Sequence, residues 1–221
     1  EIPKRDWSSD VCSSDLARGH GASAAPPGEY TIDDLGQDAV DVLDAAGAAR
    51  AHICGLSLGG LTAIWIALRA PERAGSIVLA NTAARIASAT FWQDRINLIR
   101  AEGLGQVAAG APVRWFTGEY ARTHPDVITR CQAMVTQCAP LGYAACAAAL
   151  RDADLRPDLG RIRARTLVIT GRHDPVTPPA DAVALRDGIP NAAFLELDAA
   201  HFSNIERAEE FTAGVLGVCN G

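Results

Sequence analysis

Residues Gly55-Leu56-Ser57-Leu58-Gly59 form a G-x-S-x-G motif, and the residues on either side of it decide the fold. The apolar stretch Ala51–Cys54 before the motif predicts a short buried strand, and Leu61–Arg69 after it predicts a buried helix that stops at Pro71. A strand, a sharp turn and a helix would lift the Ser57 hydroxyl onto an exposed elbow. Glycines suit both sides of the serine because the turn leaves no room for side chains. The alternative is that Ser57 merely caps the following helix, which would explain neither glycine.

A serine nucleophile on such an elbow needs an acid and then a histidine further along the chain. Asp174 follows Thr166–Thr170, a predicted strand rich in β-branched residues, and His201 follows the predicted strand Ala193–Leu197. In an open parallel sheet, the carboxyl ends of the strands bring such loops to one edge. Asp174 could instead be an ordinary turn residue, and His201 an ordinary loop histidine.

Other acids and histidines are weaker candidates. Asp181 and Asp187 fall within or at the end of a predicted helix after Pro179, and Asp198 precedes His201 too closely to orient it easily. The remaining histidines lie in turns, in loops or inside the strand before the elbow: His20, His52, His124 and His173.

Composition excludes several classes of function. The 221 residues include 20 basic and 26 acidic side chains, a balance that argues against nucleic-acid or membrane partners. No apolar run approaches the ~20 residues of a membrane span. No H-x-x-x-H, H-E-x-x-H or C-x-x-C pattern occurs, so no metal site is predicted. The six cysteines have no framework spacing, which indicates reduced thiols and a cytoplasmic protein, with Cys54 and Cys146 as small core residues.

The order of predicted elements indicates an α/β fold with a mostly parallel sheet and helices on both faces. Thr31–Gly47 predicts an amphipathic helix opened by a capping box, and Ser76–Ala80 predicts a strand. From 87 to 160 no strand-like run occurs, only helical stretches. We therefore expect a core made of residues 17–86 and 161–221, with residues 87–160 inserted as a helical cap.

Five stretches carry a family resemblance: Arg18–Ser23, Cys54–Gly60, Leu79–Ile86, Pro140–Cys146 with Arg151–Asp154, and Asp198–Asn204. The first two are general to many α/β-hydrolases. The Asn-Thr-Ala-Ala-Arg, Gly-Tyr-Ala-Ala-Cys and Ala-Ala-His-x-Ser-Asn runs are closer to one branch. Over about residues 17–218 the sequence resembles the 3-oxoadipate enol-lactonases of the α/β-hydrolase superfamily.

The resemblance implies a cofactor-free serine hydrolase that opens a small carboxylated lactone with a Ser57, Asp174 and His201 triad. The N–H of Leu58, next after the nucleophile, would donate to the oxyanion. An acidic substrate needs a cation, and Arg85, just past the Ser76–Ala80 strand, is the first candidate. Arg114 is its rival, and Trp92 and Trp115 are candidates for the pocket lining. The alternatives are surface arginines and tryptophans buried within the cap.

Residues 1–16 fit nothing in that family and resemble a translated sequencing-adapter fragment; the alternative is a divergent natural terminus. The family has strands before Arg18, and a loop among them supplies a second oxyanion N–H. We therefore expect this chain to fold poorly or react slowly, by ~10²–10³ for one lost donor. Another esterase, C–C hydrolase or haloperoxidase on this scaffold, or a weakly catalytic binding protein, remain alternatives. The sequence carries no indication of oligomeric state.

Overall fold

The computed structural model describes residues 17–220, so the prediction for residues 1–16 lies outside the described part. Within it, four parallel strands form one sheet in the order β1-β2-β3-β4. The strands are β1 (Ala51–Leu56), β2 (Ala74–Ala80), β3 (Arg165–Gly171) and β4 (Ala193–Leu197). The core helices are α1 (Ile32–Ala45), α2 (Leu58–Arg69), α9 (Pro179–Gly188), α10 (Ser203–Glu206) and α11 (Ala208–Cys219). The strands are those expected, extended by up to two residues at their ends.

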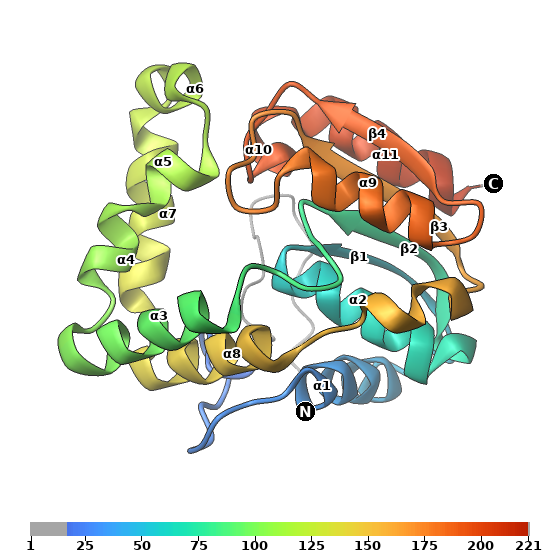
Figure 1. The fold of residues 1–221 in the computed structure, drawn as a ribbon, viewed down its shortest axis with the longest axis horizontal. Coiled ribbons are helices and arrows are strands. Elements are labelled where there is room, and N and C mark those ends of the chain that lie inside the picture. The colour runs from blue at the N-terminus through green and yellow to red at the C-terminus, as the bar shows by residue number, and fades with distance from the viewer. Residues whose placement is uncertain (1–16, 221) are drawn as a thin grey trace.

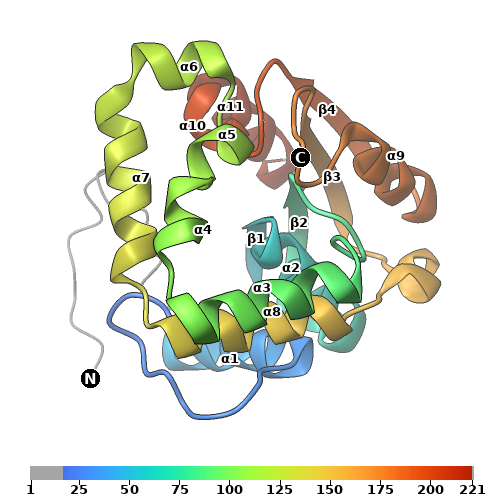
Figure 2. The same cartoon turned by 60° about the vertical axis from the view of Figure 1, so that its left-hand side comes forward.

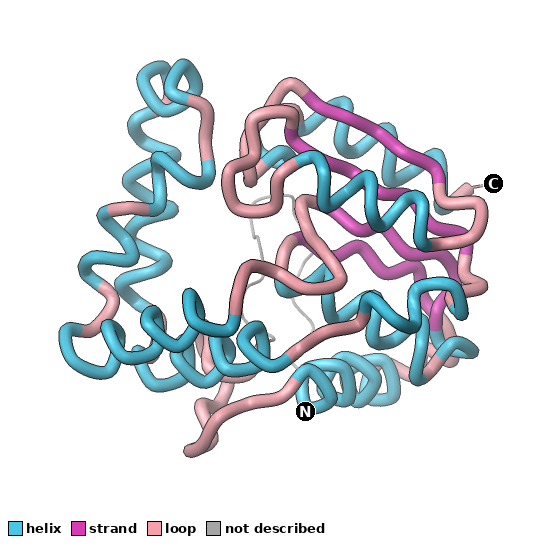
Figure 3. Tube along the Cα trace, in the orientation of Figure 1, coloured by secondary structure: helices cyan, strands magenta, loops and turns pink. Residues whose placement is uncertain are grey.

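Helices cover the two faces of the sheet as the alternation of side chains requires. Ile77 and Leu79 of β2 point into one hydrophobic cluster with α2 and α9, whereas Val78 and Ala80 point into another with α11. Figures 1 and 3 show α9 in front of the sheet and α11 behind it. The α/β fold predicted from the order of elements is confirmed.

The N-terminal part of the described chain packs beside α2, the helix that follows the elbow. Thr31 caps α1, and its side chain and that of Asp34 form the predicted capping box. The indole of Trp65 in α2 donates a hydrogen bond to Asp33 of α1. Tyr30, just before the cap, is almost completely buried. These contacts fix α1 against α2.

Every regular element between β2 and the end of residue 160 is helical: α3 (Ala89–Glu102), α4 (Gly105–Ala109), α5 (Ala111–Trp115), α6 (Gly118–Thr123), α7 (Pro125–Gln137) and α8 (Pro140–Asp152), with 3-10 turns at Arg156–Arg161 and, earlier, Pro71–Arg73. We call residues 87–160 the cap segment. It has a hydrophobic cluster of its own, in which Ile96 and Ile99 of α3 meet Ala144 and Ala148 of α8. Figure 2 shows α3 and α8 running side by side below α4, α5 and α6.

Strand β1 is an edge of the described sheet, and this corrects one expectation. Cys54 in β1 is exposed rather than part of the core, because no described strand covers that side of β1. Cys146 in α8 is buried, as predicted. Among the described residues no single helix is long and apolar enough to cross a membrane; only α7 and α8 taken together, bent by 95°, meet that length and composition.

Candidate active site

Ser57 stands in the tight turn that joins β1 to α2. Its backbone has φ 55° and ψ −118°, a conformation that costs a non-glycine residue energy and recurs at functional sites. The turn is held from β2 and the loop after it. Ser57 N–H donates to the carbonyl of Ala80 at 3.0 Å, and the Thr82 hydroxyl donates to the carbonyl of Ser57 at 2.7 Å. The Ser57 side chain makes no capping hydrogen bond to α2, so the helix-cap alternative is wrong.

The glycines around Ser57 have different roles. A Cβ on Gly55 would lie 2.1 Å from the carbonyl oxygen of Gly59, and one on Gly60 would lie 2.5 Å from the Thr82 side chain. Gly59 itself has open space where a Cβ would stand. The steric argument therefore holds for Gly55 and is wrong for Gly59; the second crowded position is Gly60.

Asp174 and His201 form a buried pair at the carboxyl edge of the sheet. His201 Nδ1 lies 2.8 Å from Asp174 Oδ2, and each residue is 3% exposed. An ionised carboxylate can only accept, so Nδ1 carries the proton and Nε2 is left free to act as a base. Burial raises the pKa of Asp174, but the hydrogen bond and charge of His201, with hydrogen bonds from Asn81 and Thr177, outweigh it and keep that pKa below its ordinary value.

The same carboxylate is held by further donors that the sequence did not reveal. Its Oδ1 accepts the N–H groups of Val176 at 2.7 Å and Thr177 at 3.1 Å, and its Oδ2 accepts the Thr177 hydroxyl at 2.7 Å. Asn81, at φ 44°, donates from Nδ2 to Oδ2 at 2.9 Å and accepts the Ser203 hydroxyl at 2.5 Å. Asn81 directly follows β2, where a polar residue at a strand end was the available signal.

The rival acids lie elsewhere. Asp181 is in α9 and Asp187 near its end, as expected. Asp198 is exposed and pairs with His173 and Arg207 at the surface. Asp174 is thus the acid that faces His201.

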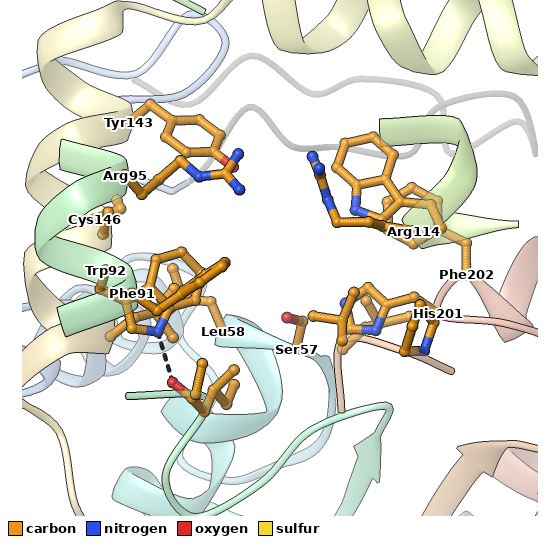
Figure 4. A pocket seen from close by; sticks show the side chains of 18 of the residues that line it. Ser57, Leu58, Phe91, Trp92, Arg95, Arg114, Tyr143, Cys146, His201 and Phe202 are labelled. Atoms are coloured by element: carbon orange, nitrogen blue, oxygen red, sulfur yellow. Dashed lines mark hydrogen bonds between the residues drawn. The ribbon is translucent and has the colours of Figure 1, made fainter. Parts of the chain in front are cut away.

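A cavity of about 380 Å³ opens over the elbow and the histidine. Its walls include the predicted residues Ser57, Leu58, Trp92, Arg114, Trp115 and His201, together with residues that were not predicted, among them Phe91, Arg95, Tyr143 and Phe202. In Figure 4, Ser57 and His201 lie next to each other on one side of the cavity. No hydrogen bond joins their side chains in the described structure; in ligand-free enzymes such bonds are often long and tighten only with substrate.

Leu58 begins α2 and lies beside Ser57. The first N–H groups of a helix have no acceptor within that helix, so the Leu58 N–H is available to a developing oxyanion. This is compatible with the predicted oxyanion role.

Two guanidiniums face the cavity from the cap segment. Figure 4 shows Arg95 from α3 and Arg114 from α5 pointing toward each other, across the cavity from Ser57 and His201. Among the described residues neither has a carboxylate within ion-pair distance; Arg114 donates to the carbonyl of Val107 at 3.1 Å. Burial first, and then the charge of Arg95, lower the pKa of Arg114. Arg95 lies three residues after Trp92, on the same face of α3, and that spacing was a usable signal.

Arg85 does not line this cavity, which corrects the first candidate for a substrate cation. Its guanidinium pairs with Asp154 at 3.3 Å. A hydrogen bond from Arg156 and the charges of Arg156 and Arg85 hold the pKa of Asp154 at about 2. The loop after β2 turns Arg85 away from the elbow, a direction that sequence distance from the strand end could not reveal.

The two tryptophans line the cavity and also pack against the protein. Trp92 donates from Nε1 to the carbonyl of Ile86 at 2.6 Å. Trp115 stacks on Phe202, with ring centroids 4.5 Å apart. The two interpretations made from sequence, pocket wall and packing residue, are therefore compatible.

Comparison with known proteins agrees with this geometry. The family model for the alpha/beta hydrolase fold matches residues 10–208. The chain belongs to the α/β-hydrolase family. It is 42% identical to 3-oxoadipate enol-lactonase 2 of Acinetobacter baylyi over 91% of this chain and 75% of that protein.

Solved α/β-hydrolases have the same arrangement. The enol-lactonase from Burkholderia xenovorans LB400 superposes with a TM-score of 0.91 at 41% identity, over 93% of this chain and 79% of that one. A thermophilic esterase from Thermogutta terrifontis superposes with a TM-score of 0.85 at 28% identity, over 91% and 76% of the two chains. The α/β-hydrolase fold expected from the resemblance is thereby confirmed.

Proposed function

We propose that this α/β-hydrolase opens the ring of 3-oxoadipate enol-lactone, a small lactone that bears a carboxylate arm, to give 3-oxoadipate. The observation that carries the proposal is a single cavity that holds the elbow serine and the buried Asp174–His201 pair on one side and two guanidiniums on the other. The identity to enol-lactonases over most of the chain supports the choice of lactone.

In the first half of the reaction, His201 Nε2 takes the proton from the Ser57 hydroxyl as its oxygen attacks the lactone carbonyl. The Leu58 N–H donates to the oxyanion of the tetrahedral intermediate. That intermediate collapses by breaking the ring C–O bond, and the leaving oxygen takes the proton from His201. The product stays attached as an ester of Ser57 and carries an enol, which becomes the ketone.

In the second half, His201 draws a proton from water as the water attacks the ester of Ser57. Collapse of the second tetrahedral intermediate returns the proton to Ser57 and releases the new carboxylic acid, which ionises. Asp174 stays ionised throughout, orients His201 and stabilises its imidazolium form. An activated ester needs only these groups, and the cycle requires no cofactor.

The carboxylate arm of the substrate is assigned to the arginine pair. A guanidinium binds a carboxylate through two parallel N–H donors, and Arg114 and Arg95 have no competing carboxylate among the described residues. Trp92, Trp115 and Phe91 would cover the apolar part of the ring. The free thiols of Cys54, Cys138, Cys146 and Cys219 accord with the cytoplasm as its compartment.

The test is turnover of the lactone together with labelling by a serine-directed phosphonate. We expect the wild type to open the lactone and to be labelled, and Ser57→Ala to lose labelling and about 10⁴-fold or more of kcat. Ser88→Ala is a matched control, because Ser88 only caps α3. A wild-type chain that binds the lactone but is neither labelled nor active would support the binding-protein alternative. Labelling without lactone turnover would favour another hydrolase.

A further inference from the structure

Glu206 is a buried carboxylate that makes no ion pair among the described residues. It ends the short helix α10, five residues after His201, and is 9% exposed. Burying a carboxylate is costly unless hydrogen bonds replace its lost water. Glu206 accepts hydrogen bonds from donors in two segments that lie far apart in the chain.

One carboxylate oxygen of Glu206 is shared between the two segments. Oε1 accepts the N–H of Ala200, the residue before His201, at 2.9 Å, and also the N–H of Thr117 at 3.1 Å. Oε2 accepts the Thr117 hydroxyl at 2.7 Å. A single side chain therefore ties the histidine loop to the cap segment.

A second set of contacts connects the histidine loop to the cap segment. The Phe202 N–H donates to the carbonyl of Trp115 at 2.9 Å, and the Phe202 ring stacks on Trp115 and meets Phe116 edge-on. In Figure 2, α10 lies directly behind α5 and α6. Residues 115–117 thus contact Phe202 and Glu206, which follow His201, and they are linked through Glu206 to Ala200, which precedes it.

Arg114 lies next to these contacts on the side of the cap segment. It directly precedes Trp115 and reaches into the cavity, with Phe202 near it and His201 across the cavity in Figure 4. A shift of residues 115–117 relative to residues 200–206 would change the separation between the arginine and the histidine. The contacts between residues 115–117 and residues 200–206 therefore determine whether Arg114 can bind the carboxylate arm while His201 and Ser57 act on the carbonyl.

We propose that Glu206 is a positioning residue that holds the histidine loop and the Arg114 segment in one arrangement, a role that rests on the proposed function of this site. Glu206 acts through Ala200 and Thr117 rather than on substrate. A misplacement of about 1 Å between reacting groups can cost on the order of 10²-fold in rate. We expect Glu206→Ala to lower kcat for the lactone 10- to 100-fold.

The variants separate positioning from simple stability. Glu206→Gln keeps an oxygen for both N–H groups, and its amide can donate to the Thr117 hydroxyl, so we expect activity within threefold of wild type. Thr117→Val removes the cap-side hydroxyl, which also accepts the Tyr120 N–H at 3.3 Å as the N-cap of α6, and should lower kcat severalfold. Thr117→Ser keeps both hydrogen bonds and should not lower it. Glu210→Ala is the control for losing a carboxylate, because Glu210 is exposed on α11.

Three readouts are compared on folded protein below its Tm: kcat and KM for the lactone, the rate of phosphonate labelling of Ser57, and the downfield proton resonance of the His201–Asp174 hydrogen bond. We expect Glu206→Ala and Thr117→Val to slow labelling and shift the resonance, with less than multiplicative losses in the double variant. The resonance needs no turnover, so a failed lactone assay would count against the proposed function alone. Unchanged kcat, labelling and resonance in folded Glu206→Ala or Thr117→Val would overturn the proposal, and so would equal losses in Glu206→Gln and Glu206→Ala.

Discussion

Asp174 at the edge of the sheet accepts hydrogen bonds from Val176, Thr177, Asn81 and His201, whereas Arg114 on the cap segment donates only to one backbone carbonyl among the described residues. Both groups are charged, Asp174 buried and Arg114 half-buried, yet only the first has its hydrogen-bonding capacity filled by the protein. The core has prearranged the groups proposed to be catalytic, and the cap segment holds cations that a ligand can satisfy. We infer that chemistry is set by the core and substrate choice by the cap segment.

The strongest test of this contrast between the core and the cap segment is to change the core carboxylate, Asp174. Asp174→Asn should lower kcat on acidic and neutral esters alike by about 10⁴-fold, because the amide no longer favours the working tautomer of His201. Asp198→Asn is the control, since Asp198 is exposed and pairs with His173 and Arg207 rather than with His201. Steady-state kinetics on both ester types measure the effect. A loss confined to acidic esters would contradict a purely catalytic core.

The elbow gives a second test, in stability. Gly55→Ala places a Cβ 2.1 Å from a backbone oxygen that cannot move aside, and we expect it to cost about 3 kcal/mol or more of the free energy of unfolding. Gly59→Ala meets open space in the first turn of α2 and should stabilise by about 0.5–1 kcal/mol. Urea unfolding measures both. Equal destabilisation by the two would show that the crowding at Gly55 is not what shapes the turn.

Sequence was a good guide to the core because its signals are local. The nearly continuous apolar strands, the capping box of Thr31 and Asp34, and the order of serine, acid and histidine can each be read along the chain. The fold was therefore predictable, and so was the pairing of Asp174 with His201 at the sheet edge.

Long-range geometry was beyond the same signals. Arg85 follows a strand end just as Asn81 does, yet it turns to Asp154 while Asn81 turns to Asp174. Glu206 and Thr117 are hydrogen-bonded although 89 residues separate them in the sequence, and no local pattern around either residue predicts this contact. The cap segment was predicted as helical, but the positions of Arg95 and Arg114 follow from how its helices pack.

The cap side of the comparison is tested by arginine variants. Arg114→Ala should lower kcat/KM for the carboxylated lactone by about 10- to 100-fold, the range expected for lost hydrogen bonds to a charged group, and leave a neutral ester within threefold. Arg85→Ala is the matched control and should leave both substrates unchanged, because Arg85 pairs with Asp154 outside the cavity. Equal losses on both substrates in Arg114→Ala would assign it a structural role. A selective loss in Arg85→Ala would restore the first candidate.

Acid unfolding offers the smallest effect, because it compares two aspartates whose pKa is lowered, one buried and the other exposed. A carboxylate whose pKa is depressed in the folded chain adds stability above its unfolded pKa, near 3.8 for Asp174, and loses it as pH falls through the lower folded value. The pKa of Asp198 is also lowered, by hydrogen bonds from His173 and then Arg207. Asp198 is exposed, however, and solvent weakens the contribution of these interactions to stability. The free energy of unfolding should therefore fall less steeply below pH 4 in Asp174→Asn than in wild type, while Asp198→Asn should follow wild type closely. The comparison uses the slope of the free energy of unfolding against pH, so the constant cost of placing an amide among the donors around residue 174 cancels. Parallel slopes in all three proteins would mean that the buried carboxylate is not held in its ionised form.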